Sequence, residues 1–162
     1  MAFSSAAAPT FWQQMRAGYS TADAARAVAM SERQVRYLAT HGLVRASILH
    51  TAGRGSPALY AYGDLLKLAA IQRIRLAVAA DTTLERLRAV AAALQRADAT
   101  TERGQMLVMD EQTAWLEPDG LRTVLADGRA VVVLSLDALD EQLRLKLRRE
   151  GLGDRVREKK VA

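Results

Sequence analysis

The chain has 162 residues, half of them hydrophobic, which suffices for a buried core and excludes a protein that is disordered throughout. It contains no cysteine, so disulfides, thiolate metal sites and thiol catalysis are excluded. The net charge of +5 is unevenly distributed, because residues 1–100 carry twelve Lys or Arg and six Asp or Glu, whereas residues 105–141 carry two and eight.

Residues 1–18 predict an N-terminal segment with one short helix over residues 10–17, in which Phe11, Trp12 and Met15 form the packing side. The segment lacks the charged start and the long apolar run of a signal peptide, and no apolar run in the chain approaches the length of a membrane span. We therefore expect a soluble, cytoplasmic protein with no membrane partner.

Two short helices are predicted next, each preceded by a serine in a capping pattern. The first follows Ser20 and has a length of about ten residues. The second extends over residues 32–41, with Ser31 as its cap and Gly42 as its end. Two short helices joined by a tight turn are typical of a helix-turn-helix, which makes this region a candidate for DNA binding.

A change of pattern after the second helix predicts a two-stranded wing. The runs "LVRASILH" (43–50) and "ALYAYG" (58–63) are extended in character, and "TAGRGSP" between them has the glycine and proline content of a loop. Helical spacing then predicts one helix over residues 64–79 and another that begins with a Thr82-x-x-Glu85 capping box. The apolar stripe of this later helix consists of Leu84, Leu87, Val90 and Leu94.

The polar stretch "DATTERG" (98–104) is the predicted linker between two domains, and residues 105–150 form a small α/β module after it. Two short strands are predicted around Asp110 and Glu111, and "AVVVLSL" further on is typical of a buried strand. The intervening "DGLRTVLADG" favours one or two helical turns over a further strand.

The module closes with a predicted helix, after which residues 151–162 form a basic tail. The acidic residues of this helix come first and the basic ones last, which is the order that complements the helix dipole. One apolar face of the helix consists of Leu136, Leu139, Leu143 and Leu147. The predicted fold class is therefore mainly α, with a winged helix-turn-helix domain over residues 19–97 followed by a small α/β module.

Several motifs within residues 19–96 occur in an order known from one family. They are "YST" (19–21), "SERQVRY" (31–37), "HGLVRAS" (41–47), "RGSPALYAYGDLLKL" (54–68) and "IQRIRLAVAADTTLERLRAVAAAL" (71–94). These motifs resemble those of the MerR-type winged helix-turn-helix regulators, and the resemblance implies a DNA-binding domain. Where that family continues into a long antiparallel dimerisation helix, this chain has the polar linker and the acidic module instead.

The second predicted helix is the candidate DNA-reading element. Val35 and Leu38 would face inward, while Arg33, Arg36 and Tyr37 share the opposite side, where guanidinium groups reach guanine edges or phosphates in a major groove. The alternative is a solvated charged face or, for Tyr37, a half-buried aromatic ring packed against the wing. Together with the resemblance, this pattern predicts DNA binding by Thr21, Ser31, Arg33, Gln34, Arg36, Tyr37, Arg45, Arg54, Ser56 and Tyr60.

Catalytic and metal-binding patterns are missing from the sequence. His41 and His50 have no acidic or cysteine partners at metal-ligand spacing. There is also no Ser-His-Asp arrangement, phosphate loop or glycine-rich dinucleotide signature. We therefore expect neither an enzyme nor a bound metal or cofactor, and fewer than sixty residues beyond the linker leave little room for a pocket that senses a small molecule.

Two functions are compatible with these features. The first is a sequence-specific regulator of bacterial transcription, a nucleoid-associated homodimeric repressor that binds an inverted repeat in double-stranded DNA. Its dimer contact would be the C-terminal module, through the strands predicted at 106–109 and 131–134 and the leucine face of the last helix, formed by Leu136, Leu139, Leu143 and Leu147. The alternative is a DNA-binding antitoxin or adaptor, in which residues 105–150 bind a protein partner.

Overall fold

The computed structural model describes residues 18–49, 57–79, 82–99, 104–117, 128 and 130–153. This part of the chain forms five helices and three strands: α2 (Thr21–Val28), α3 (Glu32–Thr40), α4 (Tyr62–Val78), α5 (Leu84–Ala99), β1 (Met106–Met109), β2 (Ala114–Glu117), β3 (Val132–Ser135) and α7 (Leu136–Arg149). The helix predicted over residues 10–17, the turns predicted between β2 and β3 and the basic tail lie largely or wholly outside the described residues. The protein is mainly helical, as predicted.

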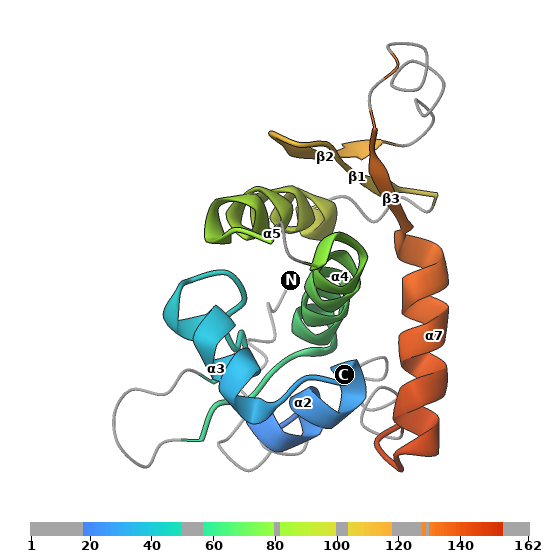
Figure 1. The fold of residues 1–162 in the computed structure, drawn as a ribbon. Helices are drawn as coiled ribbons and strands as arrows, with labels where there is room; N and C mark the ends of the chain where they lie inside the picture. Colours follow the sequence, from blue (N-terminus) through green and yellow to red (C-terminus); the bar gives the residue numbers. More distant parts are fainter. Residues whose placement is uncertain are drawn as a thin grey trace, which may run out of the picture.

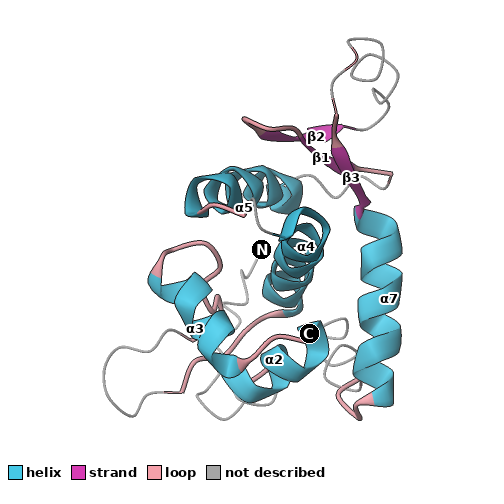
Figure 2. Cartoon of the chain, in the orientation of Figure 1, coloured by secondary structure: helices cyan, strands magenta, loops and turns pink. Residues whose placement is uncertain are grey.

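Helix α4 lies at the centre of the structure (Figure 1). It packs against α2, α5 and α7, and the three-stranded sheet lies beyond α5, against which β1 and β2 pack (Figure 2). Because neighbours surround α4, it buries side chains on more than one of its sides, including Leu65, Leu68, Ile71 and Ile74. Leu76, near the end of the same helix, is instead 69% exposed.

Side-chain caps define the ends of α2 and α3, as predicted. The Ser20 hydroxyl accepts a hydrogen bond from the backbone of Asp23 at 3.1 Å. Ser31 and Gln34 form a reciprocal capping box, in which each backbone N–H donates to the other residue's side chain. Gly42 has a φ of +71°, which favours glycine, so the chain turns sharply just beyond α3.

The predicted wing is only partly formed in the described residues. Leu49 and Leu59 make a single antiparallel bridge, and Tyr60 then pairs with Tyr19 instead of continuing the ladder. Regular strands are therefore absent from residues 43–49 and 57–60, which corrects the prediction for these segments. The physical reason is that the core buries consecutive residues here, such as Leu43 and Val44. In a half-exposed strand, only every second side chain is buried.

A buried carboxylate fixes the base of this region. Asp64 is 4% exposed, and its Oδ2 atom accepts hydrogen bonds from the Ser47 backbone at 2.9 Å, the Ser47 hydroxyl at 2.6 Å and the Ala61 backbone at 2.8 Å. Because Asp64 reaches back to Ala61, α4 begins at Tyr62, before the predicted start. The residue thereby ties the segment after α3 to the first turn of α4.

Helix α5 has a different cap from the predicted one. The Thr83 hydroxyl accepts a hydrogen bond from the backbone of Arg86 at 3.3 Å, whereas the Thr82 hydroxyl donates to the carbonyl oxygen of Ala79. The prediction of Thr82 as the cap is therefore wrong by one position. The predicted apolar stripe is confirmed: Leu87, Val90 and Leu94 are buried, and Leu84 is partly buried.

The sheet is antiparallel, with strand order β2-β1-β3. Asp110 closes the β1–β2 hairpin, because its Oδ1 atom accepts hydrogen bonds from the backbones of Gln112 and Thr113. Both strands of this hairpin were predicted. The prediction of a fully buried third strand is wrong, since β3 is an edge strand whose side chains alternate between partly buried and exposed.

One hydrophobic cluster extends from Tyr19 to Leu152 and includes residues on both sides of the predicted linker. Helix α5 continues to Ala99, inside that linker, and α7 packs on α4 and α2. The predicted module thus shares the core of the preceding helices. The four leucines predicted to form a dimer contact, Leu136, Leu139, Leu143 and Leu147, are buried within the single chain.

The predicted leucine face of α7 therefore has a different role from the one expected. Helical periodicity identified an apolar face correctly, but the face is covered by α4 and α2 rather than left open for a second copy. Among the described residues there is no helix with the length and apolar character that crossing a membrane requires.

Candidate nucleic-acid interface

The outer side of α3 presents the side chains that were predicted to contact DNA. Arg33, Arg36 and Tyr37 are exposed, and Tyr37 as a whole is 47% exposed, so it is not packed against a wing in the described residues. Val35 and Leu38 are buried and hold the helix against the core. The predicted division of this helix into an inner and an outer side is confirmed.

The two arginines of α3 differ in their surroundings. Arg36 pairs with Glu32 one turn earlier, and both side chains are largely exposed to solvent. An exposed pair at this helical spacing contributes only about 0.3–0.5 kcal/mol, so a phosphate can displace the carboxylate at small cost. Arg33 forms no ion pair with the described part of the chain, and its guanidinium is available to a ligand.

Tyr37 and His41 form an aromatic pair at the end of α3. Their ring centroids are 4.0 Å apart, and His41 Nδ1 lies 2.9 Å from the carbonyl oxygen of Tyr37. The side chain of Arg45 lies nearby, over Gly42, 3.3 Å from the point that a Cβ atom of that residue would occupy. Arg45 is exposed, as its predicted contact with DNA requires.

Tyr60 does not have the exposure that its predicted contact with DNA requires. The residue is 2% exposed, and its backbone pairs with Tyr19 on the inside of the fold. Burial raises the pKa of the Tyr60 phenol, while a hydrogen bond with Thr21 and the positive charge of Arg36 act in the opposite direction. Tyr60 is therefore a core residue, which corrects the prediction that it contacts DNA.

The remaining predicted contacts fall into two groups. Thr21 is the first residue of α2, and Ser31 caps α3, so both lie at helix N-termini, where backbone N–H groups favour anions. Arg54 and Ser56 lie outside the described residues. The structure thus brings Thr21, Arg36 and Tyr60 together but leaves Tyr60 without a free surface.

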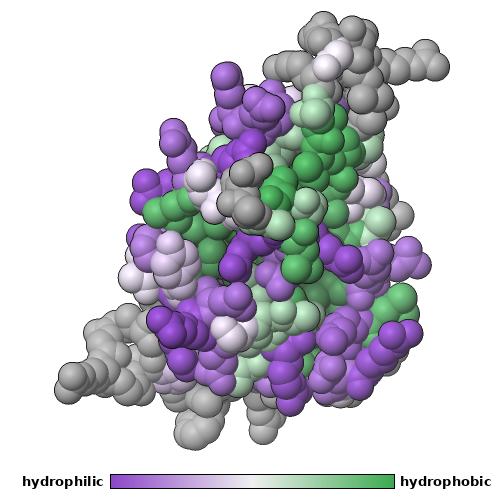
Figure 3. Space-filling view, in the orientation of Figure 1, coloured by the Kyte–Doolittle hydropathy of each residue, from purple (hydrophilic) through white to green (hydrophobic). Residues whose placement is uncertain are grey.

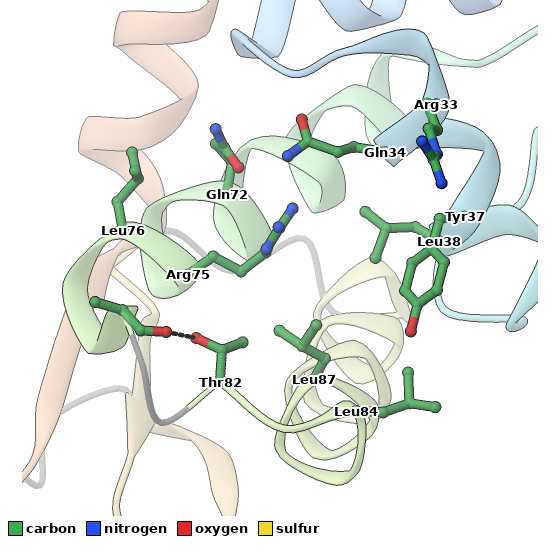
Figure 4. Close-up of a pocket in the computed structure, with 11 residues that line it drawn as sticks. Arg33, Gln34, Tyr37, Leu38, Gln72, Arg75, Leu76, Thr82, Leu84 and Leu87 are labelled. Carbon is green, nitrogen blue, oxygen red and sulfur yellow. Dashed lines mark hydrogen bonds between the residues drawn. The ribbon is translucent and has the colours of Figure 1, made fainter.

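The sequence interpretation missed a groove beside α3. Gln72 and Arg75 of α4, together with Leu84 and Leu87 of α5, face α3 across a groove of about 560 Å³ (Figure 4). Arg75 lies on the helix predicted over residues 64–79. Its spacing of three residues from Gln72 places both on one side of α4, but nothing in the sequence says that this side faces α3.

The described residues contain no group of three His, Cys, Asp or Glu side chains that could hold a metal ion.

No protein-family model matches the chain, and a comparison with curated proteins finds no significant match. The functional assignment therefore depends on the geometry of α3 and its surroundings.

Proposed function

We propose that the chain is a sequence-specific double-stranded DNA-binding regulator of transcription, which inserts α3 into the major groove. The observation that carries the proposal is the outer side of α3, where Arg33, Arg36 and Tyr37 project from a short, capped helix anchored by Val35 and Leu38. A major groove about 12 Å wide accepts a helix of about 10–12 Å diameter. Arginine is also the side chain best suited to bidentate contacts with guanine.

Gln34 is a weaker candidate for base contact than the arginines. Its Oε1 atom accepts the hydrogen bond from the Ser31 backbone at 2.8 Å, which completes the capping box. A bidentate contact with adenine uses both the oxygen and the nitrogen of the amide. Gln34 would therefore have to give up its role in the cap, and we assign sequence reading first to Arg33 and then to Arg36.

The MerR-type winged helix-turn-helix is the architecture that we propose for residues 19–96. The short connection between α2 and α3 and the Leu49–Leu59 bridge at the base of residues 50–58 support it. A repressor acting as a two-fold dimer on an inverted repeat is part of the proposal. Its dimer contact must use a surface other than the leucine face of α7, which is covered by α2 and α4.

The antitoxin or adaptor alternative has less support. It assigns partner binding to residues 105–150, whose leucine face on α7 and inner side of the sheet already belong to the core of the chain itself.

Selection of bound duplexes from a random DNA pool tests the proposal on the full chain. We expect a defined motif, with an affinity that falls as salt is raised because phosphate contacts release counterions. Arg33→Ala should weaken binding to the selected duplex by about 1–3 kcal/mol and relax one position of the motif. Arg88→Ala, an exposed arginine of α5 outside the groove, is the matched control. Absence of any enriched motif would overturn the proposal.

A further inference from the structure

The groove beside α3 combines residues from α3, α4 and α5. Figure 4 shows Leu84 and Leu87 of α5 opposite Tyr37 and Leu38 of α3, with Arg75 of α4 at another edge of the groove and its guanidinium directed toward Gln34. In the space-filling view, apolar surface is visible between α3 and α5, with hydrophilic side chains at its borders (Figure 3). The groove is thus an apolar floor with a polar border.

The charge of this border is positive. Arg33 and Arg75 are the charged residues among those that line the groove, and the lining contains no Asp or Glu. Neither guanidinium pairs with an acidic side chain in the described ranges, in contrast to Arg36, whose partner is Glu32. Gln34 and Gln72 add amide groups to the same border. A carboxylate in the groove would meet two cations, and the described lining residues include no competing acid.

The apolar part of the groove is large enough for a small organic molecule. Its volume of about 560 Å³ lies in the range of small-molecule sites, which combine an apolar lining with a few convergent polar groups. Leu38 and Leu87 are buried, Leu84 is partly buried, and Leu76 is 69% exposed at the α4 side. A ligand with an apolar body would cover leucine surface that now faces water.

We propose that this groove binds a small organic carboxylate with an apolar body and that such a ligand competes with DNA. Arg75 and Arg33 take the carboxylate through charge-assisted hydrogen bonds, and the leucines contact the apolar body. The competition rests on the proposed function, because Arg33, Gln34 and Tyr37 belong both to the groove and to the side of α3 assigned to DNA. By linkage, DNA weakens ligand binding by the same factor.

Binding is tested first without DNA. Decanoate and 1-naphthoate serve as alkyl and aryl probes, with decanol and 1-naphthalenemethanol as neutral matches, and backbone chemical shifts of the full chain report the site. We expect saturable shifts confined to α3, α4 and α5 for the carboxylates, and binding weakened about tenfold by Arg75→Gln because a charge-assisted contact is lost. Arg88→Gln should bind like the unaltered chain. Equal binding of carboxylates and neutral matches, or no saturable binding of either carboxylate, overturns the proposal.

Competition is tested with the selected duplex. The carboxylate that binds should release DNA from the unaltered chain, and about tenfold more of it should be needed with Arg75→Gln. Carboxylate binding without any selected DNA motif would overturn the proposed function and leave the groove as a ligand site. Simultaneous binding of the carboxylate and DNA, each at unchanged affinity, would overturn the competition while both sites stand.

Discussion

The phenol of Tyr62 donates a hydrogen bond to the carboxylate of Asp140, which lies 78 residues further along the chain. Asp140 also pairs with Arg144 at 3.0 Å, and the guanidinium of Arg144 lies 4.8 Å from the centre of the Tyr62 ring. This polar contact fastens the first turn of α4 to α7. It lies at the junction of the regions that the sequence interpretation assigned to separate domains.

Replacement of Tyr62 by phenylalanine should therefore lower the free energy of unfolding by about 1 kcal/mol, the usual net value of one hydrogen bond. The ring and its contact with Arg144 are retained in this variant. Urea unfolding followed by circular dichroism measures the change. Tyr37→Phe is the matched control, because the phenol of Tyr37 is exposed and should contribute little. Equal losses in both variants would contradict this role of Tyr62.

Stability should fall at alkaline pH partly through the same tyrosine. Burial and the hydrogen bond to Asp140 raise the pKa of Tyr62 above its usual value of 10.0, because both disfavour the phenolate. Since the folded pKa exceeds the unfolded one, this contribution is complete below pH 10.0 and is lost as the pH rises toward the folded pKa. The free energy of unfolding in urea should fall above this pH, and less steeply in Tyr62→Phe. An equally steep fall of the unfolding free energy with pH in both proteins would contradict this contribution of Tyr62.

Among the acidic residues, Asp64 should be one whose replacement lowers the free energy of unfolding most. Asp64→Ala removes three hydrogen bonds and leaves the Ser47 and Ala61 N–H groups without their partner, so we expect a loss of about 3 kcal/mol in the free energy of unfolding. Glu141→Ala, at an exposed site of α7, is the control and should change it by less than about 0.5 kcal/mol. A loss of similar size in both would argue against the buried carboxylate as an anchor.

Removal of the charge of Glu32 should strengthen DNA binding. Glu32→Gln frees Arg36 from its ion pair and removes an acid from the side of α3 that we propose contacts DNA, so the affinity should rise by about two- to fivefold at low salt. Fluorescence anisotropy with the selected duplex at two salt concentrations measures the effect, which should shrink at the higher salt. Weaker binding by this variant would mean that Arg36 needs Glu32 to hold its orientation.

The leucine face of α7 should affect stability rather than association. Leu143→Ala creates a cavity against neighbouring helices and should cost about 2–5 kcal/mol of unfolding free energy. Leu145→Ala, two residues away and 42% exposed, should cost much less. Light scattering should give the same molar mass for the folded Leu143→Ala variant as for the unaltered chain. Dissociation of a dimer by Leu143→Ala would instead support the predicted dimer contact at this face.

The elements best predicted from the sequence are those determined by local interactions. The caps at Ser20 and Ser31, the turn at Gly42 and the apolar side of α7 all follow from patterns within a few residues. The same patterns do not say which surface covers an apolar side. Leu143 could therefore be recognised as buried, but not as a contact of the same chain.

The candidate site was predictable in part for the same reason. The outer side of α3 follows from helical periodicity, which places Arg33 opposite Val35. The contribution of Arg75 depends on how α4 and α5 pack beside α3, and the burial of Tyr60 depends on its pairing with Tyr19. Both are long-range relationships, which a single sequence read by local pattern does not contain.

The bridge between Leu49 and Leu59 joins two residues that lie ten positions apart in the sequence. Leu59 is held by this bridge, and Asp64 holds Ser47, so both ends of residues 50–58 are attached to the core. Doubling the length of a flexible loop between fixed ends costs only about 0.6 kcal/mol of closure entropy. Insertions between these two leucines should thus cost little stability and leave the orientation of α3 unchanged.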